Sequence, residues 1–174
     1  RLSKHCEDNG LLVDEQNGFR KDRSCLDHLY VVSSIIRNRL VNKQSTYAAF
    51  IDMKKAFDWV DRDLLLYKIM SQFGIRGRLY EAISCIYSLS TATVRVNQFN
   101  TETFQTYYGV KQGDTLSPTL FSMFLNDLAT GIKGLGCGID VGDIHLSLLL
   151  YADDIVLLAP TEEMLQKQLD FVSD

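Results

Sequence analysis

The sequence predicts an α+β fold, in which an antiparallel sheet lies on one side and helices pack against it. Two segments have the pattern of β-hairpins, and hairpins join antiparallel strands. Helical patterns lie between the strand patterns, so strands and helices are interleaved along the 174 residues. The composition fits a folded globular chain, because 46% of the residues are hydrophobic and 23% are charged.

The N-terminal third predicts one helix followed by one strand. Ser24 and Asp27 have the spacing of a capping box at a helix start. Apolar residues follow at helical spacing, namely Leu29, Val32, Ile36 and Leu40. Residues 46–53 are β-branched, aromatic and apolar for the most part, which predicts a buried strand.

The middle of the chain predicts two helices and a hairpin. Asp61 is a candidate N-cap for the helix that follows it. Apolar spacing predicts another helix around residues 79–86. Residues 93–96 and 103–107 have the composition of strands and flank residues 97–102, which predicts a β-hairpin.

The C-terminal third predicts a helix, a second hairpin and a last helix. The serine–proline pair at residues 117–118 is typical of a helix start. We expect Gly131 to end that helix. Between residues 145 and 159, two apolar runs bracket a pair of adjacent aspartates, which predicts the hairpin. Residues 161–163 then open the last helix.

Charge, cysteine spacing and apolar run length argue against several kinds of protein. The formal net charge of −4 argues against a basic clamp for nucleic acid over the whole chain. The four cysteines lack the paired spacing of a zinc site or a disulfide framework, which favours a reduced, intracellular setting. The longest apolar run, residues 146–151, is too short to span a membrane, so we expect no membrane partner. The missing initiator Met suggests a piece of a longer protein.

Three aspartates stand at the ends of apolar runs: Asp52, Asp153 and Asp154. A tight turn could explain the adjacent pair, and a helix N-cap could explain Asp52. The pair lacks the glycine of the usual two-residue hairpin turn, however. Carboxylates brought together by a sheet repel one another unless a divalent cation neutralises them. Such oxygen ligands suit Mg²⁺, and two such ions can flank a phosphoryl transfer. Nucleases and cyclases also use such acidic pairs.

Four sequence blocks resemble those of reverse transcriptases from retrotransposons without long terminal repeats. The first block is Gln16–Arg20. Phe50–Asp58 resembles polymerase motif A, Gly109–Pro118 resembles motif B, and Tyr151–Asp154 resembles motif C. Group II intron enzymes are more distantly similar. The four blocks occur in the family's order and cover nearly the whole chain.

The resemblance implies a right-hand polymerase fold. Residues 1–45, approximately, would belong to the fingers, and residues 46–174 would form the palm. The thumb, and the basic fingers residues that grip the triphosphate, would lie outside this chain. We therefore expect the isolated chain to be inactive as a polymerase, although its acidic residues are present.

The resemblance also implies the metal ligands. Asp52 and Asp153 would be the principal ligands, the backbone carbonyl of Met53 would assist, and Asp154 would be the adjacent acid. The cofactor would be Mg²⁺, as two ions, with Mn²⁺ as a substitute. A turn-tip carboxylate held by backbone amides remains the alternative interpretation of Asp154.

Five further residues match positions near the substrates. The ring of Phe57 would lie beneath the incoming sugar and exclude a 2′-hydroxyl, although a core aromatic residue is the alternative. Gln112 and Gly113 would lie against the nucleotide and the template strand, or simply form a turn that needs glycine. Arg20 and Lys21 would contact nucleic acid, or form a solvated basic pair.

The implied function is that of an RNA-directed DNA polymerase, a nucleotidyltransferase that adds deoxynucleotides to a primer 3′-hydroxyl. Its partners would be an RNA template, a DNA primer, deoxynucleoside triphosphates and the remainder of a parent polyprotein. Family resemblance implies a nuclear location. Two alternatives remain: an RNA-polymerase-like palm, which an acidic residue at position 57 would favour, and a non-catalytic nucleic-acid-binding remnant, which need not keep the carboxylates.

Overall fold

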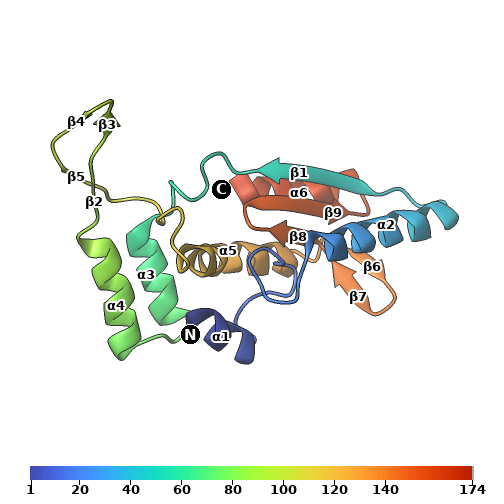
Figure 1. Cartoon of the computed structure of the whole chain (residues 1–174). Coiled ribbons are helices and arrows are strands. Elements are labelled where there is room, and N and C mark those ends of the chain that lie inside the picture. The colour runs from blue at the N-terminus through green and yellow to red at the C-terminus, as the bar shows by residue number, and fades with distance from the viewer. Residues whose placement is uncertain (174) are drawn as a thin grey trace. The chain divides into compact units, whose positions relative to one another are not determined.

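A computed structural model describes residues 1–173 and divides the chain into two units. The first unit combines Arg1–Lys54 with Leu125–Asp174, and the second is Lys55–Phe124. Figure 1 draws the second unit mainly in green and yellow. Asp174, the last residue of the predicted palm portion, lies outside the described residues.

The first unit is built on a three-stranded antiparallel sheet in the order β1-β9-β8. Its strands are β1 (Tyr47–Asp52), β8 (Leu148–Tyr151) and β9 (Asp154–Ala159). The predicted strand and the second predicted hairpin are thus confirmed. The expectation that β1 is buried was wrong, because β1 is an edge strand and the side chain of Phe50 is 78% exposed.

Helices cover both faces of this sheet. On one face, Leu150 and Leu157 pack with residues of α5 (Ser117–Gly134) and α6 (Glu162–Ser173). On the other face, Leu149 and Leu158 pack against Ile35 of α2 (Cys25–Val41). Successive side chains of a strand point to opposite faces, so β8 and β9 each contribute to both hydrophobic clusters. The α+β class is confirmed.

Helix α2 begins as predicted. The Asp27 carboxylate accepts a hydrogen bond from the Ser24 backbone N–H at 2.7 Å, as in a capping box. Only part of the predicted apolar set faces the sheet: Val32 packs beside the buried Ile35, whereas Leu29 and Leu40 are exposed. The helix carries apolar residues on two sides, and only contact with the sheet decides which side is covered.

The remaining elements of the first unit are one short helix and one hairpin. They are α1 (Leu2–Asp8), β6 (Ile139–Val141) and β7 (Ile144–Leu146). The prediction that Gly131 ends α5 was wrong, since the helix continues to Gly134. A Cβ atom on Gly131 would lie 2.3 Å from Cζ of Phe171 in α6. Gly131 therefore lets the two helices pack closely.

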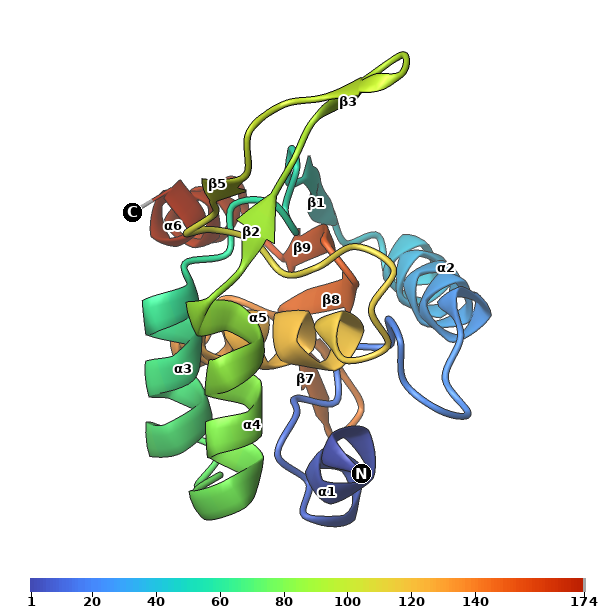
Figure 2. The ribbon, with the colours of Figure 1, turned by 60° about the vertical axis from the view of Figure 1, so that its left-hand side comes forward.

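The second unit contains two helices and a ladder of short strands. The helices, α3 (Arg62–Ser71) and α4 (Gly77–Ser88), lie side by side (Figure 2). As predicted, Asp61 caps α3, accepting a hydrogen bond from the Leu64 N–H at 2.9 Å. The ladder pairs β2 (Thr91–Ala92) with β5 (Phe104–Gln105), and β3 (Arg95–Val96) with β4 (Phe99–Asn100).

The predicted hairpin is confirmed, with a tighter turn than expected. The sequence suggested a loop over residues 97–102, whereas the strands resume at Phe99. Asn97 adopts a left-handed backbone conformation with φ of 56°, which asparagine tolerates better than most residues. Among residues 1–173, no helix is long and apolar enough to cross a bilayer.

Candidate active site

The two acidic strand ends meet in the sheet. The register of β1 and β9 places Asp52 directly opposite Asp154. Directly opposed residues of an antiparallel pair point to the same face, with Cβ atoms about 4.5–5.5 Å apart. Both residues are exposed. The structure therefore brings together two of the three predicted carboxylates, from segments about a hundred residues apart in sequence.

Asp153 lies in the two-residue turn that joins β8 to β9, directly after Ala152. Ala152 is buried and has φ of 59°, a left-handed conformation that costs a non-glycine residue about 1–2 kcal/mol. This conformation could not be predicted from the sequence, because residues that adopt it in such turns are usually glycine or asparagine. The surroundings of Ala152 must hold it in that conformation.

The donor set fits Mg²⁺ in its chemistry. Mg²⁺ is typically bound by one or two carboxylates and completes its shell with water and substrate phosphates. Among residues 1–173, no three His, Cys, Asp or Glu side chains form a group that could hold a metal ion unaided. The side chain of Met53 packs against the hydrophobic cluster, which leaves its backbone carbonyl as the available ligand. A separation of about 6 Å between the Asp52 and Asp153 carboxylates stays a prediction.

Phe57 and Gln112 belong to two segments of the second unit that contact each other. The Phe57 ring stacks on the buried ring of Phe121, with centroids 4.5 Å apart and 14° between the ring planes. The Gln112 side-chain amide donates to the Asp58 carboxylate at 3.0 Å, and the Val110 N–H donates to the Phe57 carbonyl at 2.8 Å. These contacts join the motif A and motif B segments, and they support a structural role for Asp58.

Two glycines of motif B serve different purposes. Gly113 has φ of 83°, and no atom lies within 4 Å of the position that a Cβ would take. Its backbone is thus open to an approaching ligand. Gly109 has φ of 84°, and a Cβ there would lie 2.9 Å from the Asp58 carbonyl oxygen. Gly109 is therefore required both by conformation and by close packing.

Arg62 bonds the backbone at and before the start of motif B, and the sequence did not predict this role. Its guanidinium donates to the carbonyl oxygens of Gly109 at 2.8 Å and Thr106 at 2.5 Å. The residue is only 8% exposed, and burial lowers the pKa of its guanidinium. No sequence signal distinguishes it, because an arginine at the start of a helix usually lies at the surface.

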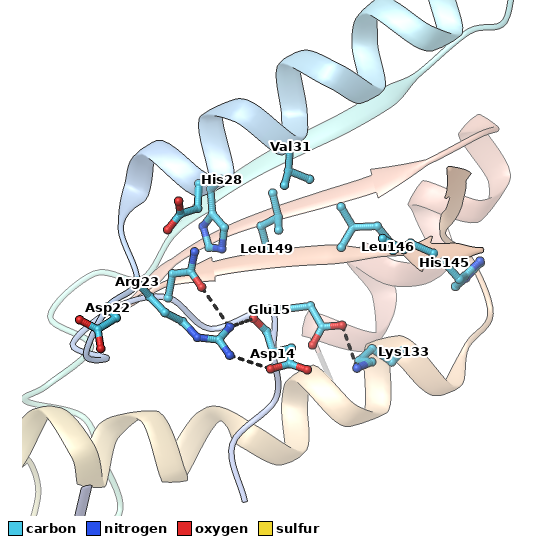
Figure 3. A pocket seen from close by; sticks show the side chains of 13 residues that line it. Asp14, Glu15, Asp22, Arg23, His28, Val31, Lys133, His145, Leu146 and Leu149 are labelled. Atoms are coloured by element: carbon cyan, nitrogen blue, oxygen red, sulfur yellow. Dashed lines mark hydrogen bonds and ion pairs between the residues drawn. The ribbon is translucent and has the colours of Figure 1, made fainter. Parts of the chain in front are cut away.

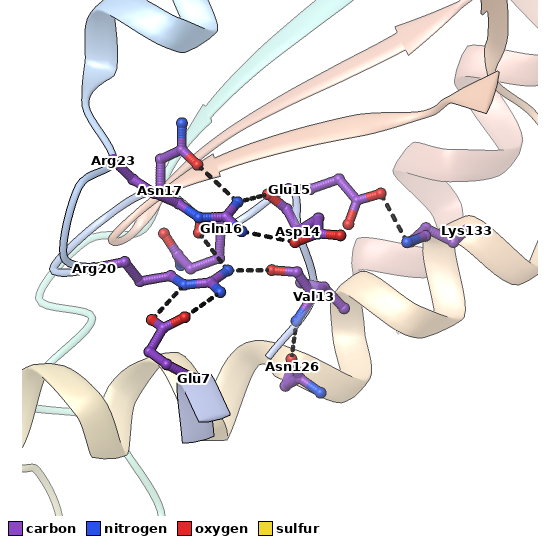
Figure 4. Close-up of polar contacts among 10 residues, drawn as sticks. All are labelled: Glu7, Val13, Asp14, Glu15, Gln16, Asn17, Arg20, Arg23, Asn126 and Lys133. Atoms are coloured by element: carbon purple, nitrogen blue, oxygen red, sulfur yellow. Dashed lines mark hydrogen bonds and ion pairs between the residues drawn. The ribbon is translucent and has the colours of Figure 1, made fainter. Parts of the chain in front are cut away.

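Arg20 and Lys21, the two residues predicted to contact nucleic acid, differ in exposure and in bonding. The Arg20 side chain is 6% exposed and forms a double hydrogen bond with the Glu7 carboxylate, at 2.8 and 2.7 Å (Figure 4). This contact raises the pKa of Arg20 and lowers that of Glu7. The Lys21 side chain is 88% exposed and lies 3.8 Å from Asp22. Arg20 is thus engaged by the fold, whereas Lys21 is open to solvent.

A cavity of about 660 Å³ lies elsewhere in the first unit (Figure 3). Its lining comes from the N-terminal loop, α2, α5, β7 and β8, and includes the ion pairs Asp14–Arg23 at 2.7 Å and Glu15–Lys133 at 2.8 Å. Burial lowers the pKa of His28 in its wall. Among the described lining residues, none is a predicted site residue, so the cavity is separate from the acidic strand ends.

Comparison with known proteins identifies the same family that the motifs indicated. A model described as "Reverse transcriptase (RNA-dependent DNA polymerase)" matches residues 1–174. The Pol polyprotein of retrotransposable element R2DM from Drosophila melanogaster is 30% identical over 91% of this chain, which covers 15% of that protein. The RNA-directed DNA polymerase of mobile element jockey from the same organism is 29% identical over 86% of this chain and 16% of its own length.

Solved structures resemble the fold. Telomerase from Candida albicans, determined with a fragment of telomeric RNA, matches 99% of this chain with a TM-score of 0.71 and 12% identity. Telomerase from Candida tropicalis matches 92% with a TM-score of 0.65 and 17% identity. The chain covers 30% and 32% of those proteins. At such identities the likeness concerns the fold alone.

Proposed function

Because this chain belongs to the reverse transcriptase family, we propose that it carries the nucleotidyl-transfer site of a non-LTR retrotransposon polyprotein. The parent would be an RNA-directed DNA polymerase that extends a primer 3′-hydroxyl with deoxynucleotides. One observation carries the proposal: Asp52 lies opposite Asp154 on one sheet, with Asp153 in the adjoining turn. Asp153 directly precedes Asp154 in the chain, so we propose that the three carboxylates act together at this end of the sheet.

Asp52 and Asp153 would be the principal metal ligands, with the Met53 carbonyl assisting. Asp154 would add negative charge beside them, since it is directly opposed to Asp52. When bound, two Mg²⁺ ions, or Mn²⁺ in their place, supply charge neutralisation at the attacking and leaving oxygens of the phosphoryl transfer. The carboxylates contribute position and charge, which is the main protein contribution in reactions of this class.

The second unit would bind the nucleotide. Phe57 would exclude a 2′-hydroxyl, and its stacking on Phe121 supports this role by restricting the movement of the ring. The Gln112 amide, which is bonded to Asp58 and directly precedes the open backbone of Gly113, would contact the nucleotide and template. Lys21 would meet the nucleic-acid backbone, and its exposure supports that role more strongly than the buried ion pair supports one for Arg20.

The partners of the parent would be an RNA template, a DNA primer and deoxynucleoside triphosphates. The R2 relatives are named Pol polyproteins, which supports a parent longer than this chain. The RNA-containing telomerase complex supports binding of RNA by a protein with this fold. An intracellular and nuclear location would follow from the same family.

A primer-extension assay on the parent polyprotein tests the function. We expect incorporation of deoxynucleotides on an RNA template, and we expect Asp153→Asn to abolish it. Asp143→Asn is the matched control, because Asp143 is an exposed aspartate in another turn of the same unit. Extension with ribonucleotides alone would favour the RNA-polymerase alternative. Nucleic-acid binding without extension would favour the non-catalytic remnant, which the presence of all three carboxylates argues against.

A further inference from the structure

The side chain of Gln16 connects the N-terminal loop to the turn that carries Asp153. Gln16 is 2% exposed. Its Oε1 accepts a hydrogen bond from the Ala152 N–H at 3.1 Å, and its Nε2 donates to the Ala152 carbonyl at 3.3 Å. One amide thus pairs with both backbone groups of the residue that precedes Asp153.

The chemistry of the amide suits this contact. Oε1 also accepts the Gly18 N–H at 2.7 Å, so the oxygen accepts two hydrogen bonds while the nitrogen donates one. A carboxylate could accept but not donate, and an apolar side chain could do neither. Without the amide, the buried N–H and carbonyl of Ala152 would lose their partner, and unpaired buried backbone groups are rare in folded proteins.

The backbone around Gln16 is fixed on both sides. The Leu150 N–H donates to the Glu15 carbonyl and the Asn17 N–H donates to the Leu150 carbonyl, both at 2.9 Å, so this segment lies along the edge of β8. On the outer side, the Arg20 guanidinium donates to the Gln16 carbonyl at 3.1 Å (Figure 4). The amide of Gln16 is therefore held in place by the loop that carries it.

Close packing at Gly18 is a second, independent contact with the same turn. A Cβ on Gly18 would lie 2.2 Å from the Ala152 nitrogen and 2.9 Å from its Cα. These are backbone atoms, so the turn itself would have to move. Gly18 does not have a positive φ, which means that space rather than conformation requires the glycine.

We propose that Gln16 is a positioning residue that fixes Ala152 in its left-handed conformation and thereby sets the direction of Asp153. The turn lacks the glycine that would adopt this conformation unaided, and the amide supplies the constraint instead. The catalytic consequence rests on the proposed function, whereas the effect on the turn does not. Arg20 acts one step further back, by holding the Gln16 carbonyl.

Hydrogen exchange on this chain tests the effect on the turn. Gln16→Met keeps the length of the side chain and removes both hydrogen bonds to Ala152. We expect the Ala152 amide to exchange at least tenfold faster in this variant, a change that corresponds to about 1.4 kcal/mol of local opening. The Leu157 amide, in the interior of β9, should exchange within about twofold of wild type.

Asn17→Ala is the matched control. Asn17 is a buried amide in the same segment, but its side chain bonds Ser24 and Arg23 instead of the turn. An unchanged Ala152 exchange rate in Gln16→Met would overturn the proposal. Equal acceleration in Asn17→Ala would also overturn it, because the turn would then be responding to general loosening of the loop.

Steady-state kinetics on the parent polyprotein test the consequence for catalysis. We expect Gln16→Met to lower kcat about tenfold while KM for the deoxynucleotide stays within about twofold, since chemistry and not ground-state binding is affected. Gly18→Ala should lower kcat as well, by displacing the same turn with Gln16 in place. Unchanged kcat together with fast Ala152 exchange would show that the contact only stabilises the fold. An inactive wild-type parent would refute the proposed function and leave the exchange result intact.

Discussion

The side chains of Arg20 and Arg62 are shielded from solvent, and several protein acceptors replace the water around each guanidinium. Arg20 shares its donors between the Glu7 carboxylate and backbone carbonyls. Arg62 bonds the carbonyls of Gly109 and Thr106. Removing an arginine or its acceptor would leave the other group unpaired. Such a loss costs more free energy than the net contribution of the hydrogen bond. At the residue scale, then, charge serves the fold in two places where the sequence suggested only surface residues.

The Glu7–Arg20 contact predicts a pH-dependent contribution to stability. Arg20 holds the pKa of the Glu7 carboxyl below its ordinary value of 4.5. A lowered pKa contributes stability that is present above the ordinary value and is lost as the pH falls through the lowered one. We expect Glu7→Gln to reduce the free energy of unfolding by about 1–2 kcal/mol at neutral pH. Urea denaturation of both proteins, above and below pH 4.5, measures this difference in the free energy of unfolding.

In that experiment the difference between wild type and Glu7→Gln should shrink as the pH falls. Glu102→Gln serves as the control, because Glu102 is exposed in the loop between β4 and β5 of the second unit. A difference that does not change with pH would mean that packing, and not the charged hydrogen bond, is what the substitution removes.

Phe57 predicts sugar selection in the parent polyprotein. Valine at this position shortens the side chain, and we expect Phe57→Val to admit ribonucleotides while deoxynucleotide incorporation stays measurable. The ratio of kcat/KM for the two nucleotides is the measurement. If that ratio is unchanged, Phe57 is a core residue whose stacking on Phe121 is its whole role.

Helix α2 and strand β1 show what periodicity leaves open for an element. Four apolar residues predicted the helix by their spacing; Val32 packs against the sheet, whereas Leu29, Ile36 and Leu40 are exposed. The alternating burial of β1 belongs to an edge strand, although its composition suggested a buried one. Composition and spacing thus predict the type of an element, while the neighbours that it meets decide which of its sides is covered.

The start of α3 provides a test at this scale. Asp61 accepts the Leu64 N–H, a donor that the helix itself leaves unpaired. We expect Asp61→Ala to reduce the free energy of unfolding by about 1 kcal/mol, as measured by denaturant titration. Asp63→Ala, which changes an exposed residue within the first turn, should cost less. Equal losses would mean that negative charge near the helix start, and not the hydrogen bond of the cap, accounts for the effect.

Over the whole molecule, the predicted site residues fall into two groups. The carboxylates of Asp52, Asp153 and Asp154 belong to the first unit, and Phe57, Gln112 and Gly113 belong to the second. Each group is held by contacts inside its own unit. In the first unit the pairing of β1 with β9 sets Asp52 opposite Asp154, and in the second the Gln112 amide bonds Asp58. The metal-binding and nucleotide-binding parts of the proposed function are therefore assembled locally.

The cysteines provide a test of the fold as a whole. All four are free, with Cys6 and Cys137 buried and Cys25 and Cys85 exposed. Burial also raises the pKa of the Cys6 thiol to about 11, which further slows its reaction as a thiolate. We expect an alkylating reagent to modify Cys25 and Cys85 rapidly in the native chain, and the other two only after denaturation. Peptide mass spectrometry over time measures this, and rapid native labelling of Cys6 would contradict the packing of α1.

The sequence by itself determined the α+β class, most elements and the family. It did so because capping residues, apolar periodicity and motif spacing are local properties of the chain. The N-cap at Asp61 and the hairpin around Asp153 could be placed for that reason. It could not place the end of α5, because the space that Gly131 leaves for Phe171 depends on a helix forty residues away.

Only the tertiary structure decided the surroundings of the site. It paired Asp52 with Asp154, shielded the side chains of Arg20 and Arg62 from solvent, and bonded the Gln16 amide to Ala152. None of these contacts leaves a periodic signal, since each joins residues that are distant in sequence or depends on burial. The physical reason is that hydrogen-bond partners and burial are properties of the assembled chain, whereas helix, strand and turn preferences belong to its segments.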